Sequence, residues 1–262
     1  MKHNTTNRFQ DFFEEEKYTT LKNYLYNYLL RKRAVEKSLK YENAGLILEI
    51  GSGISPVVTC SRHIAYSDLS LTALRILRKT HKKGMYVVAD ATCLPFKNSA
   101  FTHAIASEVL EHLRDDRSAI RELARVISPS GRLIVTFPHR KFYFANDDRF
   151  VNHYRRYELS EMVDRLNNEA LRVIDIYKVL GPLEKLTMNF VVFCFSVIQG
   201  ISRHRHKTGS GPVPAPWLTK VLVFTFKWAN RLYMVLAWLD AKIMPLNLSS
   251  VLLIKATKDH DD

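Results

Sequence analysis

Three short apolar runs in the first third of the chain each lead into a polar residue. The first, Leu46–Ile50, is followed by Gly51-Ser52-Gly53, and the next two lead to Asp68 and Asp90. Short apolar runs bounded by turn residues are typical of buried strands, and glycine lets the backbone turn sharply and approach a ligand. Three strands that each end in a polar group predict the ligand crevice of an open, parallel α/β sheet.

Helical and strand-like periodicity continues on both sides of these runs. Ser70 and Asp115 or Asp116 are placed to cap two helices, and Pro129-Ser130-Gly131 is expected to turn the chain into a fifth strand. The predicted helices are 18–39, 71–79 and 118–127, and the later strands are Leu133–Phe137, Leu171–Val179 and Ser249–Ala256.

Four sequence motifs follow one another in an order that is more specific than any one of them. After Leu46–Gly53 come Ala89–Phe96, Phe101–Leu113 and Ser128–Val135. The series resembles the class I S-adenosylmethionine-dependent methyltransferases, in the group that includes quinone-biosynthesis and many small-molecule and lipid methyltransferases. The resemblance covers roughly residues 45–177 and implies a Rossmann-like α/β sheet of seven strands with flanking helices.

The resemblance also implies S-adenosylmethionine as the cofactor, with a set of contacts. Residues of the glycine turn and Glu49 would line its methionine end. Asp68 would accept hydrogen bonds from the ribose hydroxyls, and Asp90 would meet the adenine amino group. Together with neighbouring positions, the predicted cofactor residues are Glu49, Gly51, Ser52, Gly53, Asp68, Leu69, Asp90, Ala91 and Ser107.

Two positions depart from the family pattern. Ser55 stands where a third glycine is usual, and its small side chain is expected to keep the turn intact. His103 stands where an acidic residue often precedes the fourth strand. We expect His103 to be a substitution on the protein surface.

Methyl transfer to a hydroxyl acceptor would benefit from a general base, and imidazole has a suitable pKa. The candidates are His112, His139 and His153, which all follow strand ends in the resembled fold. The segment Asn152–Tyr157 resembles the family's H-x-R-R-Y segment, which borders the acceptor pocket. The alternative is that the two arginines of this segment only lie on a solvent-exposed face and do not border the pocket.

The segment Glu108-Val109-Leu110-Glu111-His112 offers two carboxylates and an imidazole on adjacent turns. With His153 as a further ligand, it resembles the magnesium site of small-RNA 2′-O-methyltransferases and the site of some metal-assisted quinone O-methyltransferases. Many metal-free members of the fold carry a similar Glu-His pair that fixes loop geometry. The expected assignment is therefore no metal, with activity that persists in a chelator.

Composition indicates the number of domains, the cellular compartment and the kind of partner. A chain of 262 residues favours one domain with added segments over two equal ones. Cys60, Cys93 and Cys194 lack metal-ligand spacing, and the N-terminal residues lack the apolar stretch of a secretory signal. A reduced, cytoplasmic compartment is expected from both features. The formal net charge of +13 calls for a polyanionic partner, either a nucleic acid or an anionic membrane.

About seventy residues separate the last two predicted strands, where the resembled fold has a short link. This insertion, residues 178–248, holds nine Lys or Arg against Glu184 and Asp240, a net charge of +7. Its segment Leu186–Ser202 carries no charge but is short for a bilayer span of about 20 residues. In Trp217–Met244, a basic stripe lies beside an apolar face that includes tryptophans; the stripe comprises Lys220, Lys227, Arg231 and Lys242.

This pattern favours a helix that lies in the headgroup plane of an anionic membrane, with Arg203, Arg205 and Lys207 near the headgroups. The alternative is that the two helices of the insertion pack on each other or on a second subunit in a homodimer. The membrane affinity of the insertion is expected to be separable from catalysis. The chain then divides into cap helices at 1–44, a cofactor-binding core at 45–177, the insertion at 178–248, and the final strand with the tail at 249–262.

Three classes of function compete. The favoured one is a methyltransferase for a small-molecule or lipid-like acceptor, cytoplasmic and peripheral on the inner face of the membrane. An RNA 2′-O-methyltransferase with a Glu/Glu/His metal site has the charge and the E-x-x-E-H pattern in its favour. No Asn/Asp-Pro-Pro-Tyr motif follows the fourth strand, however, and no RNA-binding module is recognisable. Nucleic acid is therefore not the expected partner. A non-catalytic relative of the fold is disfavoured because the cofactor residues are retained.

Overall fold

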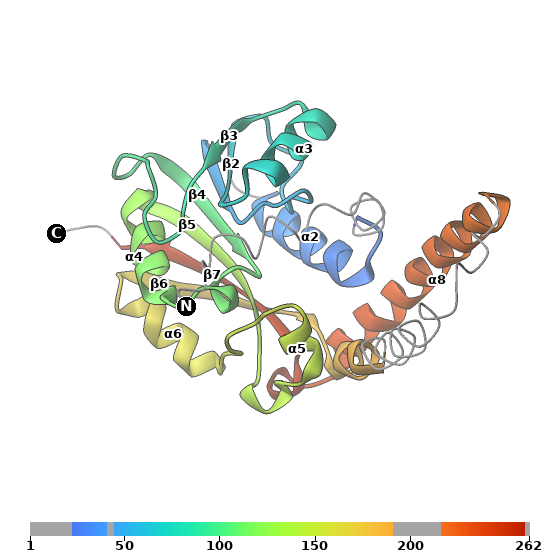
Figure 1. The fold of residues 1–262 in the computed structure, drawn as a ribbon. Helices are drawn as coiled ribbons and strands as arrows, with labels where there is room; N and C mark the ends of the chain where they lie inside the picture. Colours follow the sequence, from blue (N-terminus) through green and yellow to red (C-terminus); the bar gives the residue numbers. More distant parts are fainter. Residues whose placement is uncertain (1–22, 41–44, 191–215, 260–262) are drawn as a thin grey trace, which may run out of the picture.

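The computed structural model describes residues 23–40, 45–190 and 216–259, which form a seven-stranded mixed sheet flanked by helices (Figure 1). The strands are β1 (Ile47–Ile50), β2 (Ile64–Asp68), β3 (Met85–Val88), β4 (Phe101–Ser107), β5 (Ile127–Pro138), β6 (Leu171–Leu180) and β7 (Val251–Lys258). Their order is β3-β2-β1-β4-β5-β7-β6. The first five strands are parallel, and β7 runs antiparallel to both β5 and β6. The predicted fold class is confirmed.

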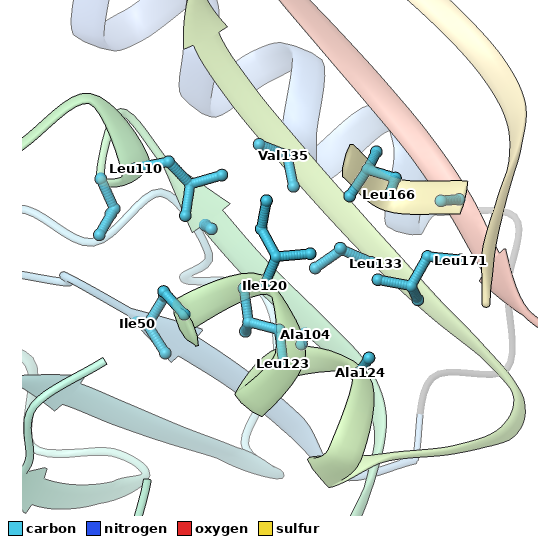
Figure 2. Close-up of a cluster of buried hydrophobic side chains, with 14 of the residues drawn as sticks. Ile50, Ala104, Leu110, Ile120, Leu123, Ala124, Leu133, Val135, Leu166 and Leu171 are labelled. Carbon is cyan, nitrogen blue, oxygen red and sulfur yellow. The ribbon is translucent and has the colours of Figure 1, made fainter. Parts of the chain in front are cut away.

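Helices cover both faces of the sheet. α4 (Asp116–Val126) and α6 (Leu159–Asn167) pack on one face, and α2 (Tyr26–Leu39), α3 (Leu71–His81) and α8 (Pro216–Ile243) contribute to the core on the other. Figure 2 shows Ile120 and Leu123 of α4 among side chains of β4 and β5. Burial of each such side chain contributes about 1.5–3 kcal/mol.

Local signals identified the capping residues of two helices, although α4 begins at Asp116, two residues before the predicted start. The Ser70 hydroxyl accepts the N–H of Ala73 at 3.1 Å, and Asp115 Oδ1 accepts the N–H of Ser118 at 3.0 Å. The sequence predicts a fifth strand that begins at Leu133, but β5 already begins at Ile127. The predicted turn survives as an irregularity inside this strand, where Ser130 has a φ of 57°.

Residues between β6 and β7 include a helical segment at 182–190 and the long helix α8. Figure 1 shows α8 projecting beyond the sheet. Its C-terminal half is tied to the body: Asp240 Oδ2 accepts the N–H of Leu183 at 3.0 Å, and Tyr233 stacks edge-on against Tyr26 of α2.

Parts of the insertion lie outside this description. They include Arg203, Arg205 and Lys207, most of the uncharged run Leu186–Ser202, and the side chains of Trp217 and Lys220. Among the helices that are described, none combines the length and apolar character needed to cross a membrane.

Four short helices complete the part of the fold that the structure describes. η2 (Leu110–His112) follows β4, and η3 (Lys141–Tyr143) and α5 (Asn146–Phe150) follow β5. η4 (Leu246–Leu248) precedes β7. Residues of η2 and α5 reach the carboxyl ends of the parallel strands, where an open α/β sheet binds its ligands.

Candidate active site

A cavity of about 710 Å³ lies at the carboxyl ends of β1 to β4. This is the size range of a small-molecule or cofactor site. All nine cofactor residues predicted from the sequence line it, together with His112 and His153. Residues of α2, α5 and the 182–190 segment also line the cavity, so parts of the chain far apart in sequence meet there.

The glycine turn after β1 is shaped for close approach to the backbone. Gly51 has a φ of 62°, and a Cβ built there would lie 2.5 Å from Val109 Cγ2. Gly53 also has a positive φ, and its N–H donates to Asp68 Oδ2 at 2.8 Å. The other oxygen of Asp68 accepts the N–H of Ser70 at 2.8 Å. Two backbone donors therefore fix the orientation of this carboxylate.

Asp90 is oriented in a similar way beyond β3. Its Oδ1 accepts the backbone N–H of Thr92 at 2.8 Å and the Thr92 hydroxyl at 2.7 Å. Across the cavity, Ser107 Oγ lies 2.8 Å from Thr136 Oγ1. These bonds hold the predicted polar groups at the strand ends rather than leaving them to rotate in solvent.

Glu49 is buried, with a relative exposure of 2%. Its two oxygens accept the N–H groups of Val57 at 2.7 Å and Val58 at 3.0 Å. Burial raises the pKa of Glu49 to about 8, although these two hydrogen bonds act in the opposite direction. The carboxyl group is therefore poised to ionise when a cation enters the cavity.

The two departures from the family pattern have different outcomes. Ser55 is buried and lines the cavity, as its position in the turn predicted. The expectation that His103 lies on the surface is wrong. Its relative exposure is 5%, because it lies within β4 at the centre of the sheet, and its Nδ1 is 3.0 Å from Thr102 Oγ1.

Two of the three candidate bases reach the cavity. The rings of His112 and His153 meet edge to face with centroids 4.7 Å apart. His139 does not belong with them, because its buried side chain does not line the cavity and its Nδ1 is 2.9 Å from the carbonyl oxygen of Ser249. Burial also lowers the pKa of His139. The structure thus removes His139 from the set of candidate bases.

A buried charge network holds His153 in place. Its Nδ1 lies 2.9 Å from Asp148 Oδ1, and the same oxygen accepts Arg156 Nε at 2.7 Å. Lys185 Nζ donates to Asp148 Oδ2 at 2.5 Å and to both oxygens of Asp147 at 2.6 Å. Burial opposes ionisation of Asp148, but the His153 hydrogen bond and the two cations outweigh it and hold its pKa below the usual range.

Glu111 lies fully buried beside the two histidines. Neither of its carboxylate oxygens accepts a hydrogen bond from the described residues, and Oε1 is 3.8 Å from His153 Nε2. Burial, and then the charge of Glu108, raise the pKa of Glu111. Glu108 has a φ of 55° and pairs with Arg31 at 3.6 Å. Among the described residues, Glu111, His112 and His153 form a group able to hold a metal ion.

Sequence reasoning missed several residues of the cavity wall. Arg31 and Tyr28 come from α2, and Glu184 and Met188 come from the insertion. Their only sequence signals were a helical stripe and a charge count, which do not say which cavity a side chain enters. Asp148 gave no signal at all, because its role depends on tertiary contacts with Lys185 and Arg156.

A family described as "Methyltransferase domain" matches residues 48–135 of the chain. The demethylmenaquinone methyltransferase of Streptomyces avermitilis is 32% identical over 108 residues, which is 40% of this chain and 47% of that protein. The chain thus aligns with about half the length of the curated relatives that it matches.

Solved structures share the fold at low identity. A phosphoethanolamine N-methyltransferase of Haemonchus contortus, in complex with S-adenosyl-L-methionine, has a TM-score of 0.56 at 17% identity, covering 96% of this chain and 60% of its own. The [4+2]-cyclase SpnF matches equally well at 18% identity, covering 87% and 80%. The fold alone therefore does not fix a reaction. Motifs, sheet order and the matching domain together show that the chain carries a methyltransferase domain of the class I S-adenosylmethionine-dependent type.

Proposed function

We propose that the protein transfers a methyl group from S-adenosylmethionine to a lipid-like acceptor at a membrane surface. The observation that carries the transfer activity is the convergence of all nine predicted cofactor residues on one cavity. S-adenosylmethionine supplies an electrophilic methyl group on its sulfonium. The protein then has to bind and orient the two reactants and exclude water, which is how positioning lowers the barrier.

The residues present fit this cofactor. Gly51 provides a stretch of backbone without a side chain, at a point where Val109 leaves no room for one. Asp68 presents an oriented carboxylate for the ribose, and Asp90 does so for the adenine. Glu49 sets a buried carboxyl group at the methionine end, where it would pair with the ammonium group.

The 182–190 segment carries both cavity-lining residues and an exposed apolar residue. Glu184 and Met188 of the 182–190 segment line the cavity, whereas Leu186 of the same segment is 70% exposed. On α8, Leu232 and Ile243 are exposed to a similar degree. Large exposed apolar patches mark interaction surfaces, and this one supports an acceptor that is drawn from a lipid phase.

Basic residues on the same helix favour an anionic membrane as the partner. Arg231 is exposed, and Lys242 Nζ sits 4.2 Å from the ring centroid of Trp238. Lysine and tryptophan beside an apolar face are typical of a helix in the headgroup plane. The demethylmenaquinone methyltransferase relative points to an isoprenoid quinone precursor as one acceptor of this class.

Radiolabelled methyl donor incubated with a lipid extract and with total RNA tests the class of acceptor. Label in the organic phase supports the proposal, and label in RNA refutes it. Liposome sedimentation tests the surface: the protein should pellet with anionic vesicles more than with neutral ones, and salt should release part of it because charges are screened over about 8 Å.

Paired variants sharpen the sedimentation test. Leu232→Glu with Ile243→Glu should reduce pelleting, whereas Leu71→Glu, at an exposed leucine on α3, should not. A wild-type protein that stays in the supernatant with both vesicle types and forms a dimer would assign the apolar face to a subunit interface instead.

A further inference from the structure

We propose that Glu184 selects the methyl acceptor by accepting a hydrogen bond from a hydroxyl or amino group on the polar end of that molecule. A molecule whose polar end is a carboxylate or a phosphate is then rejected. This selection concerns the acceptor of the proposed reaction, so it rests on the proposed function.

The lining of the cavity is acidic, although the chain as a whole is basic. Eight lining residues are Asp or Glu and three are Arg, whereas the formal net charge of the chain is +13. Carboxylates around a cavity oppose the entry of a further negative charge, and like charges in contact suppress the binding of a wrong partner. The cavity therefore favours a molecule whose polar group is neutral or cationic.

Seven of these eight carboxyl groups already have a partner or a predicted role. Three are the predicted cofactor contacts near the ends of β1, β2 and β3. Asp115 caps α4. Glu108, Asp147 and Asp148 each pair with a cation at 3.6 Å or less. The remaining carboxyl group is that of Glu184.

Glu184 lines the cavity and is nonetheless buried, with a relative exposure of 7%. A hydrogen bond with Ser250 reaches its carboxyl group, but Oε2 accepts none from the described residues. The hydroxyl of Tyr26, near enough for the charge of Glu184 to raise its pKa, also lacks a partner among them. Buried polar groups are normally paired, because leaving one unpaired is costly. A donor on a bound molecule would supply the missing partner.

The cations near Glu184 are bonded to other groups. Lys185 Nζ donates to Asp147 and Asp148. Arg156 donates to Asp148 and to two backbone carbonyl oxygens. Burial raises the pKa of Glu184, although the charges of these two cations act in the opposite direction. A hydroxyl or ammonium group at Glu184 would therefore stabilise its ionised form.

Glu184 belongs to the insertion, where the resembled fold has only a short link. Met188 lies one helical turn further along the 182–190 segment and lines the same cavity. Residues four apart lie on one face of a helix, so this face offers a hydrogen-bond acceptor beside an apolar side chain. Such a pair suits an apolar molecule with a hydroxyl or amino group at one end.

Three probes that share an apolar double ring test the selection: naphthol, naphthylmethylamine and naphthoate. The full-length protein, saturated with S-adenosylhomocysteine, is titrated with each probe by calorimetry. We expect naphthol or naphthylmethylamine to bind at least about tenfold more tightly than naphthoate, because only these two can donate to the carboxylate. The stronger of the two identifies the preferred group as a hydroxyl or an amine.

Variants of Glu184 show whether this residue causes the preference. Glu184→Gln keeps the shape of the side chain but removes its charge, so it should weaken binding of naphthylmethylamine by about tenfold and tighten that of naphthoate. Glu184→Asp keeps the charge and should keep the wild-type rank order. Asp164→Asn, at an exposed carboxylate of α6 outside the cavity, is the matched control and should bind all three probes as the wild type does. Equal affinity for S-adenosylhomocysteine shows that each variant is folded.

Four results would overturn the proposal: no binding of any probe, tightest binding of naphthoate, an unchanged rank order in Glu184→Gln, or loss of S-adenosylhomocysteine affinity in that variant. The last result would assign Glu184 to the cofactor site instead. Failure of the proposed function is a separate outcome, because label transferred to RNA would refute a lipid-like acceptor whatever the rank order of the probes.

Discussion

Gly51→Ala is the substitution whose effect the structure defines most sharply. The alanine would have to keep a φ of 62°, which costs an L-residue about 1–2 kcal/mol. Its Cβ would lie 2.5 Å from Val109 Cγ2 and 3.3 Å from Cγ1, and relief of such overpacking costs roughly 1–3 kcal/mol. If the turn keeps its shape, the free energy of unfolding falls by about 2–5 kcal/mol. If the turn moves instead, the wall of the cofactor cavity moves with it.

Two measurements separate these outcomes. Urea denaturation gives the change in the free energy of unfolding, and calorimetry gives the affinity for S-adenosylmethionine. Gly45→Ala is the matched control on the other end of β1: its φ is not in the left-handed region, and its Cβ would lie 3.0 Å from Thr102 Cγ2. We expect Gly45→Ala to bind the cofactor as the wild type does.

A double variant isolates the steric contribution. Val109→Ala removes both methyl groups that a Cβ at Gly51 would meet, so Gly51→Ala with Val109→Ala should cost less than the sum of the single changes. Couplings between residues in contact are typically 0.5–3 kcal/mol. If Gly51→Ala leaves both stability and cofactor affinity unchanged, or if the two changes are strictly additive, the reasoning about this turn is refuted.

Three further predictions concern charged groups. Asp68→Ala should weaken cofactor binding by about 1.5–3 kcal/mol in calorimetry, because a charge-assisted contact is lost; unchanged affinity would contradict its role. Cofactor binding at pH 7 should release a proton, since a cationic ligand lowers the raised pKa of Glu49, and affinity should increase with pH up to about 8. Calorimetry in buffers of different ionisation enthalpy checks this proton release. A binding enthalpy that does not depend on the buffer would contradict it. Tyr157→Phe should cost about 1–3 kcal/mol in urea denaturation, because the Tyr157 hydroxyl bonds the buried Asp116 at 2.6 Å; an unchanged midpoint would contradict it.

The parts of the fold that the sequence predicted rest on local signals. Short apolar runs marked the strands, and Ser70 and Asp115 marked helix starts, because a capping side chain acts within three residues of its own position. The cofactor end of the cavity was predictable for the same reason. Gly51, Asp68 and Asp90 each follow a strand directly, and parallel strands bring their carboxyl ends to one edge.

The proposed acceptor end was not predictable because its groups meet only through tertiary packing. His139 and His153 looked alike in sequence, since both follow predicted strand ends. The structure separates them: His139 turns into the interior toward Ser249, whereas Asp148 orients His153 at the cavity. The prediction that His103 lies on the surface was wrong for a related reason, because a single polar residue does not reveal which strand is central.

The structure also changes how the insertion must be understood. We expected residues 178–248 to carry membrane affinity that is separable from catalysis. Lys185, however, is 3% exposed and binds both Asp147 and Asp148, and Glu184 and Met188 line the cavity. Removal of the insertion would leave two buried carboxylates without their shared cation, which is strongly destabilising for a buried pair. It would also release Asp148 from the position in which it orients His153.

A deletion therefore cannot test the surface role of this segment, because loss of activity would follow whether or not a membrane is involved. Exposed positions such as Leu232 and Ile243 can test it, since they lie on the outer side of α8 and touch none of this network. The arrangement of the 182–190 segment suggests how the insertion can both line the cavity and face a membrane. Glu184 and Met188 of the 182–190 segment line the cavity, whereas Leu186 is exposed to solvent, so the proposed lipid-like acceptor, on leaving a membrane, would meet the proposed acceptor site within the width of one helix, about 10 Å.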